Sequence, residues 1–546
     1  MDRRTMLKGT GLAVAGGFLL PKSANVRADA ATGEPLRDLP EVRSSGGVLD
    51  EQLDMVARSM RVGDRPVTLD TYSGEFPGPI FRFRPGDQVR LLLRNRMRPM
   101  GIPANKLPPM CASHPGEDGS TGPPHGPVEC APHVAGQVAA AGETLPQTML
   151  ATNIHTHGLQ VSPEGNADNV FVRIDPLGQH QYVYDIPDDQ PAGLHWYHPH
   201  FHGSTSHQGW AGLSGPLIVE GDIDEVPELA EMRERTIVIN ELWLDENGEV
   251  PTALVVPTGG PVPFSSIPAV PTTTTFTLNG QLLPEVRMRP GETQRWRMLN
   301  ASPHRAIWLH VDGHPLHQVG VDGVPLARTR RVPATMLSAG NRVEFVVRAG
   351  QRPGRYPIFA REYDQGHPGG ARPTVQLGTL VVTGPPAPGQ IPTTLVTPPR
   401  MPDRPVARRR TLVFSGDITG SDGIGVRFFI DGKLYDHHRI DQTVEAGTVE
   451  EWRLVNDDVF QHPFHIHVNP FQVTDVKGIP PGDTSWDTDP SIWWDVFRLP
   501  PKGEVTIRTY FRPDITGKTV YHCHILPHED NGMMGNVLIS PPGEVS

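Results

Sequence analysis

Three stretches of this chain share one pattern of hydrophobic and polar positions. Each begins at a glycine turn, alternates apolar with polar residues and ends at an asparagine, over residues 86–95, 291–300 and 447–456. Such alternation points successive side chains to opposite faces, so each stretch predicts a half-buried β-strand. A second turn signal, Ser-Gly, Asn-Gly or Asp-Gly, precedes each stretch. The pattern therefore predicts three copies of one unit of turns and strands.

The copies recur at intervals of about 150–200 residues, which matches whole domains and not a short solenoid repeat. The chain has 546 residues, with 59 Pro and 57 Gly, a composition that favours short strands and many turns. We expect three Greek-key β-sandwich domains. Their expected bounds are 31–222, 223–390 and 391–546, with an insertion at 98–148 in the first and a Pro-rich linker at 384–404.

The first 30 residues have the order of an export signal. Arg3 and Arg4 form a twin-arginine pattern, an apolar run follows over residues 9–20, and Ala-Asp-Ala at 28–30 offers a cleavage site. The apolar run is too short to span a membrane. We therefore expect a twin-arginine signal peptide and a periplasmic or secreted protein.

The formal net charge is −12 at pH 7. An acidic chain disfavours nucleic acid and anionic membranes as partners. No apolar stretch reaches the roughly 18 residues that a membrane helix needs, so no stable membrane insertion is expected.

Candidate chemistry gathers near the end of the chain, where Cys523 stands between His522 and His524. In an extended strand, Cys523 would face one way and its two neighbours the other, so one strand could serve two metal sites. His528 and Met533 follow closely. Thiolate, imidazoles and a weak, distant Met are the ingredients of a blue-copper site. The alternative, a chance cluster in a buried strand, weakens once partners are found upstream.

Three His-x-His pairs provide those partners. Side chains at i and i+2 of a strand share a face, so each pair could hold a metal ion. Alone, each pair could equally be a structural pair or a zinc site. The pairs are His155 and His157, His198 and His200, and His465 and His467, with His462 three residues before the last. The histidines of the expected second domain form no such pair, which indicates a spacer without metal.

The remaining cysteines, Cys111 and Cys130, lie in one Pro- and Gly-rich stretch. If Cys523 is a metal ligand, an even pair remains in an exported protein, and a Cys111–Cys130 disulfide is the natural expectation.

Taken together, the motifs resemble those of the multicopper oxidases, which include laccases, bilirubin oxidases and bacterial cuprous oxidases. The matching patterns are His-x-His-Gly, His-x-His, His-Pro-x-His-x-His, and His-Cys-His followed by a His and a Met, and all are complete. The resemblance implies an all-β fold of three cupredoxin-like β-sandwiches. It also implies an oxidase with four copper ions that takes single electrons from a small reducing substrate and reduces O2 to water.

Carried over by position, the resemblance implies one type 1, one type 2 and two type 3 copper ions. The type 1 copper would take His462, Cys523 and His528, with Met533 as axial ligand. The type 2 copper would take His155 and His465. The type 3 pair would take His157, His198, His200, His467, His522 and His524.

Reduction of O2 also needs protons, and two carboxylates are candidates for their delivery. Glu529 directly follows the expected ligand His528, a position at which the family carries a proton-relay acid. Asp168 lies eleven residues after His157, which matches the family pattern approximately. The alternative for both acids is a solvated or salt-bridged carboxylate.

The donor is expected to be a phenol or an aromatic amine. Bacterial cuprous oxidases of this family often carry a Met-rich insert before the third motif, and residues 415–460 contain no Met. Aromatic side chains could wall a donor pocket, or instead belong to the core, and nearby acids could hold a cationic or phenolic donor. These are Trp486, Trp493 and Trp494, and Asp487, Asp489 and Asp495.

Two other classes of protein were weighed. One is an exported structural protein of the same fold that has lost its copper ligands, and the complete motifs argue against it. The other is an oxidase of cuprous or manganese ions in metal tolerance, which remains open.

Overall fold

The computed structural model describes residues 33–98, 149–250, 273–367, 370–417 and 427–544. These residues form six β-sheets, two for each third of the chain, and only short helices. The all-β expectation is confirmed, because alternating strands pair into sheets whose apolar faces meet. The expected signal peptide, the insertion and the Cys111–Cys130 disulfide lie outside the described residues, and the expected domain bounds remain predictions.

The first domain packs a five-stranded sheet, β1-β4-β9-β8-β6, on a four-stranded sheet, β3-β2-β5-β7. Its core includes Leu53, Phe81, Leu91 and Tyr184. The strands are β1 (Glu41–Arg43), β2 (Val48–Val62), β3 (Arg65–Tyr72), β4 (Ile80–Phe83), β5 (Gln88–Asn95), β6 (His155–His157), β7 (Gln179–Asp185), β8 (Gly193–His198) and β9 (Gly215–Val219).

The second domain packs a six-stranded sheet, β11-β10-β13-β18-β15-β16, on a five-stranded sheet, β12-β20-β19-β14-β17. The strands are β10 (Arg233–Leu244), β11 (Thr273–Leu278), β12 (Glu285–Met288), β13 (Thr293–Asn300), β14 (Ile307–Val311), β15 (Leu316–Val321), β16 (Val324–Val332), β17 (Thr335–Leu337), β18 (Arg342–Arg348), β19 (Gly354–Arg361) and β20 (Val375–Val382).

The third domain packs a six-stranded sheet, β22-β21-β24-β29-β26-β27, on a five-stranded sheet, β23-β31-β30-β25-β28. The strands are β21 (Val406–Asp417), β22 (Arg427–Ile430), β23 (Gln442–Glu445), β24 (Val449–Asn456), β25 (His462–Ile466), β26 (Phe471–Lys477), β27 (Trp493–Trp494), β28 (Val496–Leu499), β29 (Glu504–Tyr510), β30 (Gly517–Cys523) and β31 (Met534–Ser540).

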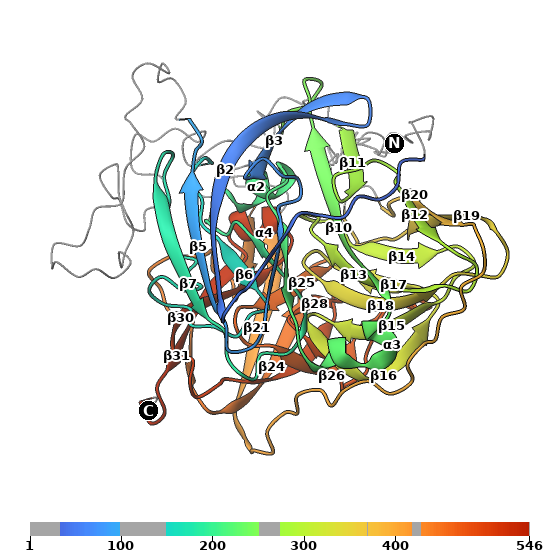
Figure 1. Ribbon diagram of the computed structural model, residues 1–546. Coiled ribbons are helices and arrows are strands. Elements are labelled where there is room, and N and C mark those ends of the chain that lie inside the picture. Colours follow the sequence, from blue (N-terminus) through green and yellow to red (C-terminus); the bar gives the residue numbers. More distant parts are fainter. Residues whose placement is uncertain (1–32, 99–148, 251–272, 368–369, 418–426, 545–546) are drawn as a thin grey trace, which may run out of the picture.

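The described residues also form short helices. They are α2 (Thr205–Trp210), η2 (Asp222–Glu225), α3 (Pro227–Ala230) and α4 (Leu526–Asp530). Figure 1 shows the second domain, green to yellow, beside the first, blue to teal, with the orange to red third domain between and below them. Among the described residues, no helix is both long enough and apolar enough to cross a membrane.

The repeated asparagine has the same role in all three domains. Asn95, Asn300 and Asn456 end β5, β13 and β24. Each side-chain amide donates to backbone carbonyls of neighbouring loops, and each Oδ1 accepts the backbone N–H two residues later. Because this bonding fixes the loop after the strand, the sequence repeat reflects a structural repeat.

The start of the described chain crosses to the second domain. Leu36 is buried in the second core, and its backbone N–H donates to the carbonyl of Glu285 at 2.8 Å. The apolar residue of this segment therefore has its partners some 250 residues along the chain.

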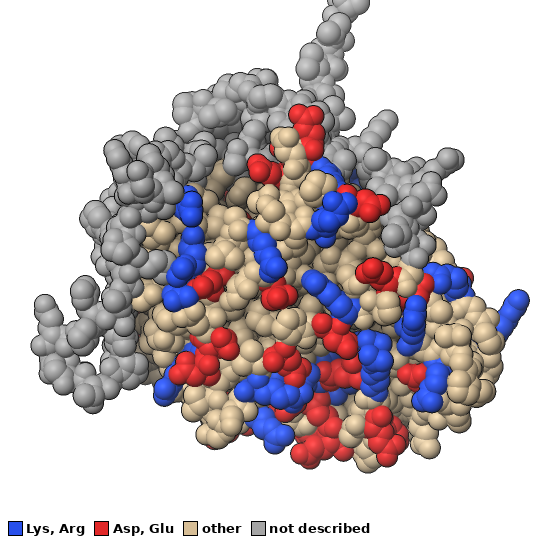
Figure 2. Space-filling model, turned by 45° about the horizontal axis from the view of Figure 1, so that its top comes forward, with Lys and Arg blue, Asp and Glu red and all other residues tan. Residues whose placement is uncertain are grey.

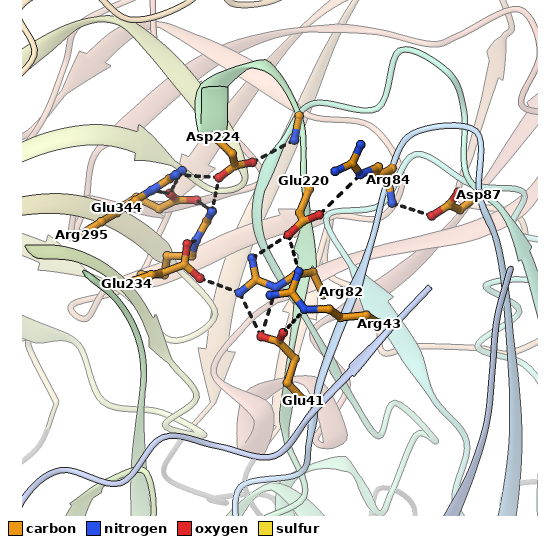
Figure 3. Close-up of polar contacts among 12 residues, drawn as sticks. Glu41, Arg43, Arg82, Arg84, Asp87, Glu220, Asp224, Glu234, Arg295 and Glu344 are labelled. Carbon is orange, nitrogen blue, oxygen red and sulfur yellow. Dashed lines mark hydrogen bonds and ion pairs between the residues drawn. The ribbon is translucent and has the colours of Figure 1, made fainter. Parts of the chain in front are cut away.

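An ion network joins the first two domains (Figure 3). Arg82 of β4 pairs with Glu234 of β10 at 2.6 Å, and Glu234 pairs with Arg297 of β13 at 2.8 Å. Arg297 also pairs with Asp224 and with Glu344 of β18. Every charge in this chain of contacts therefore has an opposite charge beside it. On the outer face drawn in Figure 2, the described acidic and basic side chains are likewise interspersed.

Candidate metal centre

The cysteine site lies inside the third domain. The thiol sulfur of Cys523 is 3.5 Å from Nδ1 of His462 and 3.7 Å from Nδ1 of His528, and these two nitrogens are 3.2 Å apart. All three side chains are buried. Burial raises the pKa of the Cys523 thiol, so a cation is needed to hold the thiolate there. One soft sulfur and two imidazoles converging on one point form a donor set for copper or zinc.

Met533 lies beside this site. It is fully buried, and its carbonyl accepts the backbone N–H of Cys523 at 3.1 Å. The ring of Phe428 stacks on His528 with centroids 3.9 Å apart. Apolar groups therefore cover part of the site, and the axial role of Met533 remains a prediction.

Strand β30 carries residues of two different sites. Phe464 of β25 lies opposite Cys523, and His465 lies opposite His522, in an antiparallel pairing. Because successive side chains alternate, the thiol of Cys523 faces the cysteine site while His522 and His524 face the first domain. The alternation predicted from the sequence is what places the two sites back to back.

Eight histidines gather between the first and third domains. His200, His467 and His522 bring their Nε2 atoms within 3.1–3.2 Å of one another. A second group forms around Nδ1 of His157, which lies 3.3 Å from Nε2 of His524, together with His198. A third contains His155, His157 and His465. The structure thus brings together all eight histidines that the sequence analysis predicts as ligands of the type 2 and type 3 coppers.

The histidines offer nitrogens that have no other partner. The Nε2 atoms of His155, His198 and His465 are buried and make no hydrogen bond among the described residues. Burial lowers the pKa of all eight imidazoles, to about 3 for His198 and about 4 for His522, so they are neutral at pH 7. Neutral imidazoles with free nitrogens fit bound metal ions, because an unsatisfied buried polar atom is otherwise costly.

Strand pairing in the first domain positions the histidines that this domain supplies to the cluster. In the β6–β8 pair, His155 lies opposite His198, which presents both at one end of the sheet. The glycine that follows, Gly158, has a φ of +94°, and a Cβ there would lie 2.5 Å from Nδ1 of His195. The His-x-His-Gly motif therefore needs glycine for its turn and for the close approach of His195.

The second domain supports the histidines without supplying one. Arg342 of β18 donates to both carboxylate oxygens of Asp495 at 2.6 Å. Asp495 in turn lies 3.1 Å from Nε2 of His157. This chain of contacts has no signal in the sequence, because its members come from three domains. The expectation that Asp495 could hold a donor is wrong, because the carboxylate is buried against His157 and Arg342.

Glu529 lies between the two sites. It follows His528 on α4, and its two carboxylate oxygens lie 3.6 Å from Nδ1 of His200 and 3.6 Å from Nδ1 of His522. The hydroxyl of Thr205 donates to it at 3.3 Å. Burial, with a contribution from Asp530, raises the pKa of Glu529 well above its ordinary value. The side chain is fully buried, so the solvated alternative does not apply.

Asp168 holds the other side of the cluster. Its carboxylate lies 2.9 Å from Nδ1 of His155 and accepts the backbone N–H of Thr156 at 2.8 Å. Burial, opposed by the hydrogen bonds from Thr156, raises the pKa of Asp168 to about 7. Asp168 is also fully buried, which rules out the solvated alternative. It orients His155 so that Nε2 faces the cluster.

Models of known protein families match most of the described chain. Three multicopper oxidase family models match residues 146–223, 233–385 and 402–543. These ranges contain every residue of the cysteine site and of the histidine cluster.

Individual relatives agree. A laccase of Bacillus subtilis is 26% identical over 421 residues, which cover 72% of this chain and 80% of the relative. A multicopper oxidase of Staphylococcus aureus is 26% identical over 409 residues, covering 71% and 77%. Among solved structures, a multicopper oxidase from Campylobacter jejuni, described as a metallo-oxidase, matches the fold with a TM-score of 0.71 and 24% identity, covering 93% of this chain and 96% of that one.

The family matches and the converging thiol and imidazoles point to the same chemistry. Multicopper oxidases bind copper and oxidise a reducing substrate with O2. The chain belongs to the multicopper oxidase family and is a copper-dependent oxidoreductase that uses oxygen.

Proposed function

We propose that this protein couples four one-electron oxidations of a phenol or aromatic amine to the reduction of O2 to two molecules of water. The observation that carries the proposal is the position of Cys523, which belongs to one site while its covalent neighbours His522 and His524 belong to the other. Electrons can therefore cross between the sites through a few bonds.

In this proposal, one type 1 copper is held by His462, Cys523 and His528, with Met533 as axial ligand. One type 2 copper is held by His155 and His465. A type 3 pair is held by the six remaining histidines: His157, His198, His200, His467, His522 and His524. Copper supplies the one-electron steps and the binding of O2.

The chain's own groups position the ligands and hold protons. The aromatic ring of Phe428 and the burial of Met533 keep water from the cysteine site. Glu529 is buried with a raised pKa, so it can keep a proton at pH 7 and deliver it beside His200 and His522. Asp168, whose pKa is raised to about 7, is suited to exchange a proton near His155.

The first test uses the purified protein loaded with copper. We expect four copper ions per chain and an intense blue colour, which Cys523→Ser should abolish because the thiolate–copper charge transfer goes with the sulfur. Met533→Leu should remain blue and have a higher potential. A Cys523→Ser protein that is equally blue would rule out the assignment.

The donor class needs a separate test. Oxidation of cuprous or manganese ions is the second candidate, because the similar structure from Campylobacter jejuni is described as a metallo-oxidase. Initial rates of the same enzyme with phenols, aromatic amines, Cu(I) and Mn(II) distinguish the two. We expect the aromatic donors to have the higher kcat/KM, and a reversed order would favour the metal oxidase.

The site of action is proposed to be the periplasm or the exterior, reached by twin-arginine export. The double substitution Arg3→Lys and Arg4→Lys should retain the precursor in the cytoplasm. Normal export of that variant would mean another route.

A further inference from the structure

A cavity lies on the seam between the second and third domains, and its lining includes Val496, which lies opposite His465 in the β25–β28 pair. Its volume is about 260 Å³, and its lining comes from β14 to β19 on one side and from residues 484–498 on the other. None of the residues that line it belongs to the cysteine site or the histidine cluster. We call it the seam cavity. Its volume is below the usual 300–1,000 Å³ of drug-sized pockets, so it suits a molecule of a single ring.

The walls of the seam cavity are aromatic. Trp486 and Trp494 both lie beside Phe497, with ring centroids 6.1 and 5.2 Å from that of Phe497. Trp308 lines the opposite side, from the second domain. Flat indole and phenyl faces of this kind favour a planar ring as ligand.

The charges around the seam cavity do not favour a cationic ligand. Asp487 is the one carboxylate among the residues that line it, and Arg330 pairs with it at 2.8 Å. Arg361 lies over the ring of Trp308 at 4.3 Å, and Arg498 over Trp486 at 3.8 Å. Of the expectation that Asp487 could hold a cationic or phenolic donor, the cationic half is therefore not supported, because the guanidinium of Arg330 already pairs with it.

Acids outside the lining reduce this positive charge only in part. Arg498 donates to the hydroxyls of Tyr363 and Ser485, and both hydroxyls donate to Asp483. This chain compensates Arg498. Arg361 is exposed at the rim and makes no ion pair with a described residue, so its guanidinium remains available to an anion.

Two buried polar atoms in the walls have no partner among the described residues. They are the indole N–H of Trp494 and Oε1 of Gln318, whose amide group donates to Thr335 at 3.0 Å. Both side chains are more than nine-tenths buried and both line the seam cavity. An unused donor and an unused acceptor in an otherwise satisfied wall are typical of a ligand site.

We propose that the seam cavity binds a small aromatic carboxylate that carries a ring hydroxyl. The ring lies between the indoles of Trp308 and Trp486. The carboxylate accepts hydrogen bonds from Arg361 and Trp494, and the hydroxyl donates to Oε1 of Gln318. This site goes beyond the proposed oxidase function, because none of its contacts involves a copper ligand.

The test is calorimetric titration of 4-hydroxybenzoate into the copper-loaded enzyme, reduced beforehand with dithionite and kept under argon, so that neither oxidised copper nor O2 can accept electrons from the phenol. Benzoate lacks the hydroxyl, and tyramine replaces the carboxylate with an ammonium. We expect benzoate to bind several-fold more weakly, as the loss of one neutral hydrogen bond predicts. Tyramine should bind at least tenfold more weakly than 4-hydroxybenzoate.

Three variants locate the ligand. Trp494→Phe and Arg361→Gln should each lower the affinity for 4-hydroxybenzoate roughly tenfold, because each removes a hydrogen-bond donor to the charged carboxylate. Gln318→Met should make 4-hydroxybenzoate bind no better than benzoate. Arg352→Gln is the matched control, since Arg352 is exposed in the same domain and does not line the cavity. This control should bind like the wild type.

Several results would overturn the proposal: no binding at millimolar 4-hydroxybenzoate, equal binding of tyramine, or variants that all bind like the wild type. An equal loss in Arg352→Gln would show general attraction to surface charge and would also overturn it. Unfolding midpoints of each variant establish that it is folded. Because binding is measured without turnover, failure of the oxidase proposal would leave this result unaffected.

Discussion

The first domain meets its two neighbours through opposite chemistries. The polar part of its contact with the second domain contains full charges, such as Arg82 beside Glu234, which also pairs with Arg297. The buried centre of its contact with the third domain contains neutral imidazoles, such as His155 and His200 against His467. Both interfaces bury polar groups, but only the charged one satisfies them with the chain alone.

The pKa shifts show the same difference. Burial raises the pKa of Glu234, but Arg297, Arg82 and Arg295 together bring it well below its ordinary value. At the histidine interface, burial and the neighbouring imidazoles all lower the pKa of His155. Paired charges stabilise each other inside the network, whereas clustered imidazoles oppose one another's protonation. A metal cation is what the second interface requires and the first does not.

One strand serves both interfaces. Arg342 and Glu344 stand two residues apart on β18 and so share a face. The backbone N–H of Leu194 donates to Glu344 at 2.8 Å, and the carbonyl of Leu194 accepts from Arg342 at 3.2 Å. Leu194 lies on β8, four residues before His198. The second domain thus fixes the strand that carries a predicted ligand.

The largest effect is expected from a substitution that stops proton delivery at the histidine interface and leaves the ion network intact. Glu529→Gln should slow reoxidation of the reduced enzyme by O2 by about 10²–10⁴-fold, because the amide keeps the size of the side chain but cannot relay a proton. Stopped-flow spectroscopy separates this step from reduction by the donor, which should stay nearly normal. Reoxidation at the wild-type rate would make Glu529 a structural acid only. Asp168→Asn should share the defect if both acids serve one relay.

The next effect breaks the ion network and leaves the histidines in place. Arg297→Met removes the guanidinium that contacts Glu234, Asp224 and Glu344. Loss of one partner from a buried network typically costs about 3–5 kcal/mol. Denaturant unfolding of the copper-loaded protein measures the loss. A change below about 1 kcal/mol would mean that the network is not as closed as its contacts indicate.

The third prediction compares the two interfaces through the pH dependence of the unfolding free energy of copper-depleted protein. A histidine whose folded pKa is lowered contributes stability that is present above its unfolded pKa, about 6.5, and is lost as pH falls below it. The unfolding free energy should therefore decline below about pH 6.5, by at least about 1.4 kcal/mol per pH unit. Glu234 also has a lowered pKa, so its contribution should persist until pH falls below about 4.5. A copper-depleted protein equally stable at pH 5 and pH 7 would contradict the comparison.

The smallest effect tests the exposed rim of the same network. Arg84 is exposed and lies 3.5 Å from Glu220. Arg84→Gln should cost less than about 1 kcal/mol, because solvent screens such a pair. The contrast with Arg297→Met, measured in one denaturant series, isolates the contribution of burial. A loss as large as that of Arg297→Met would show that position in the network does not matter.

Much of the fold and of the copper site could be predicted from the sequence, because the signals are local. Alternation of apolar and polar residues requires strands, and the same alternation separates Cys523 from His522 and His524. The glycine turns and terminal asparagines repeat because each domain contains the same turn before this strand and the same loop after it. Positive φ at Gly86, Gly291 and Gly447 confirms those turns.

Other features were decided only by the tertiary structure. Neither the contact of Arg342 with Asp495, nor the crossing of Leu36 to the second core, has a signal in its own stretch of sequence. The seam cavity differs from the sequence expectation for the same reason. Asp487 and Trp486 looked like an acidic aromatic pocket, but Arg330 and Arg361 arrive from another domain and reverse its charge. A side chain's periodicity is fixed by its neighbours along the chain, whereas its electrostatic partners are fixed by which surfaces the folded domains bring together.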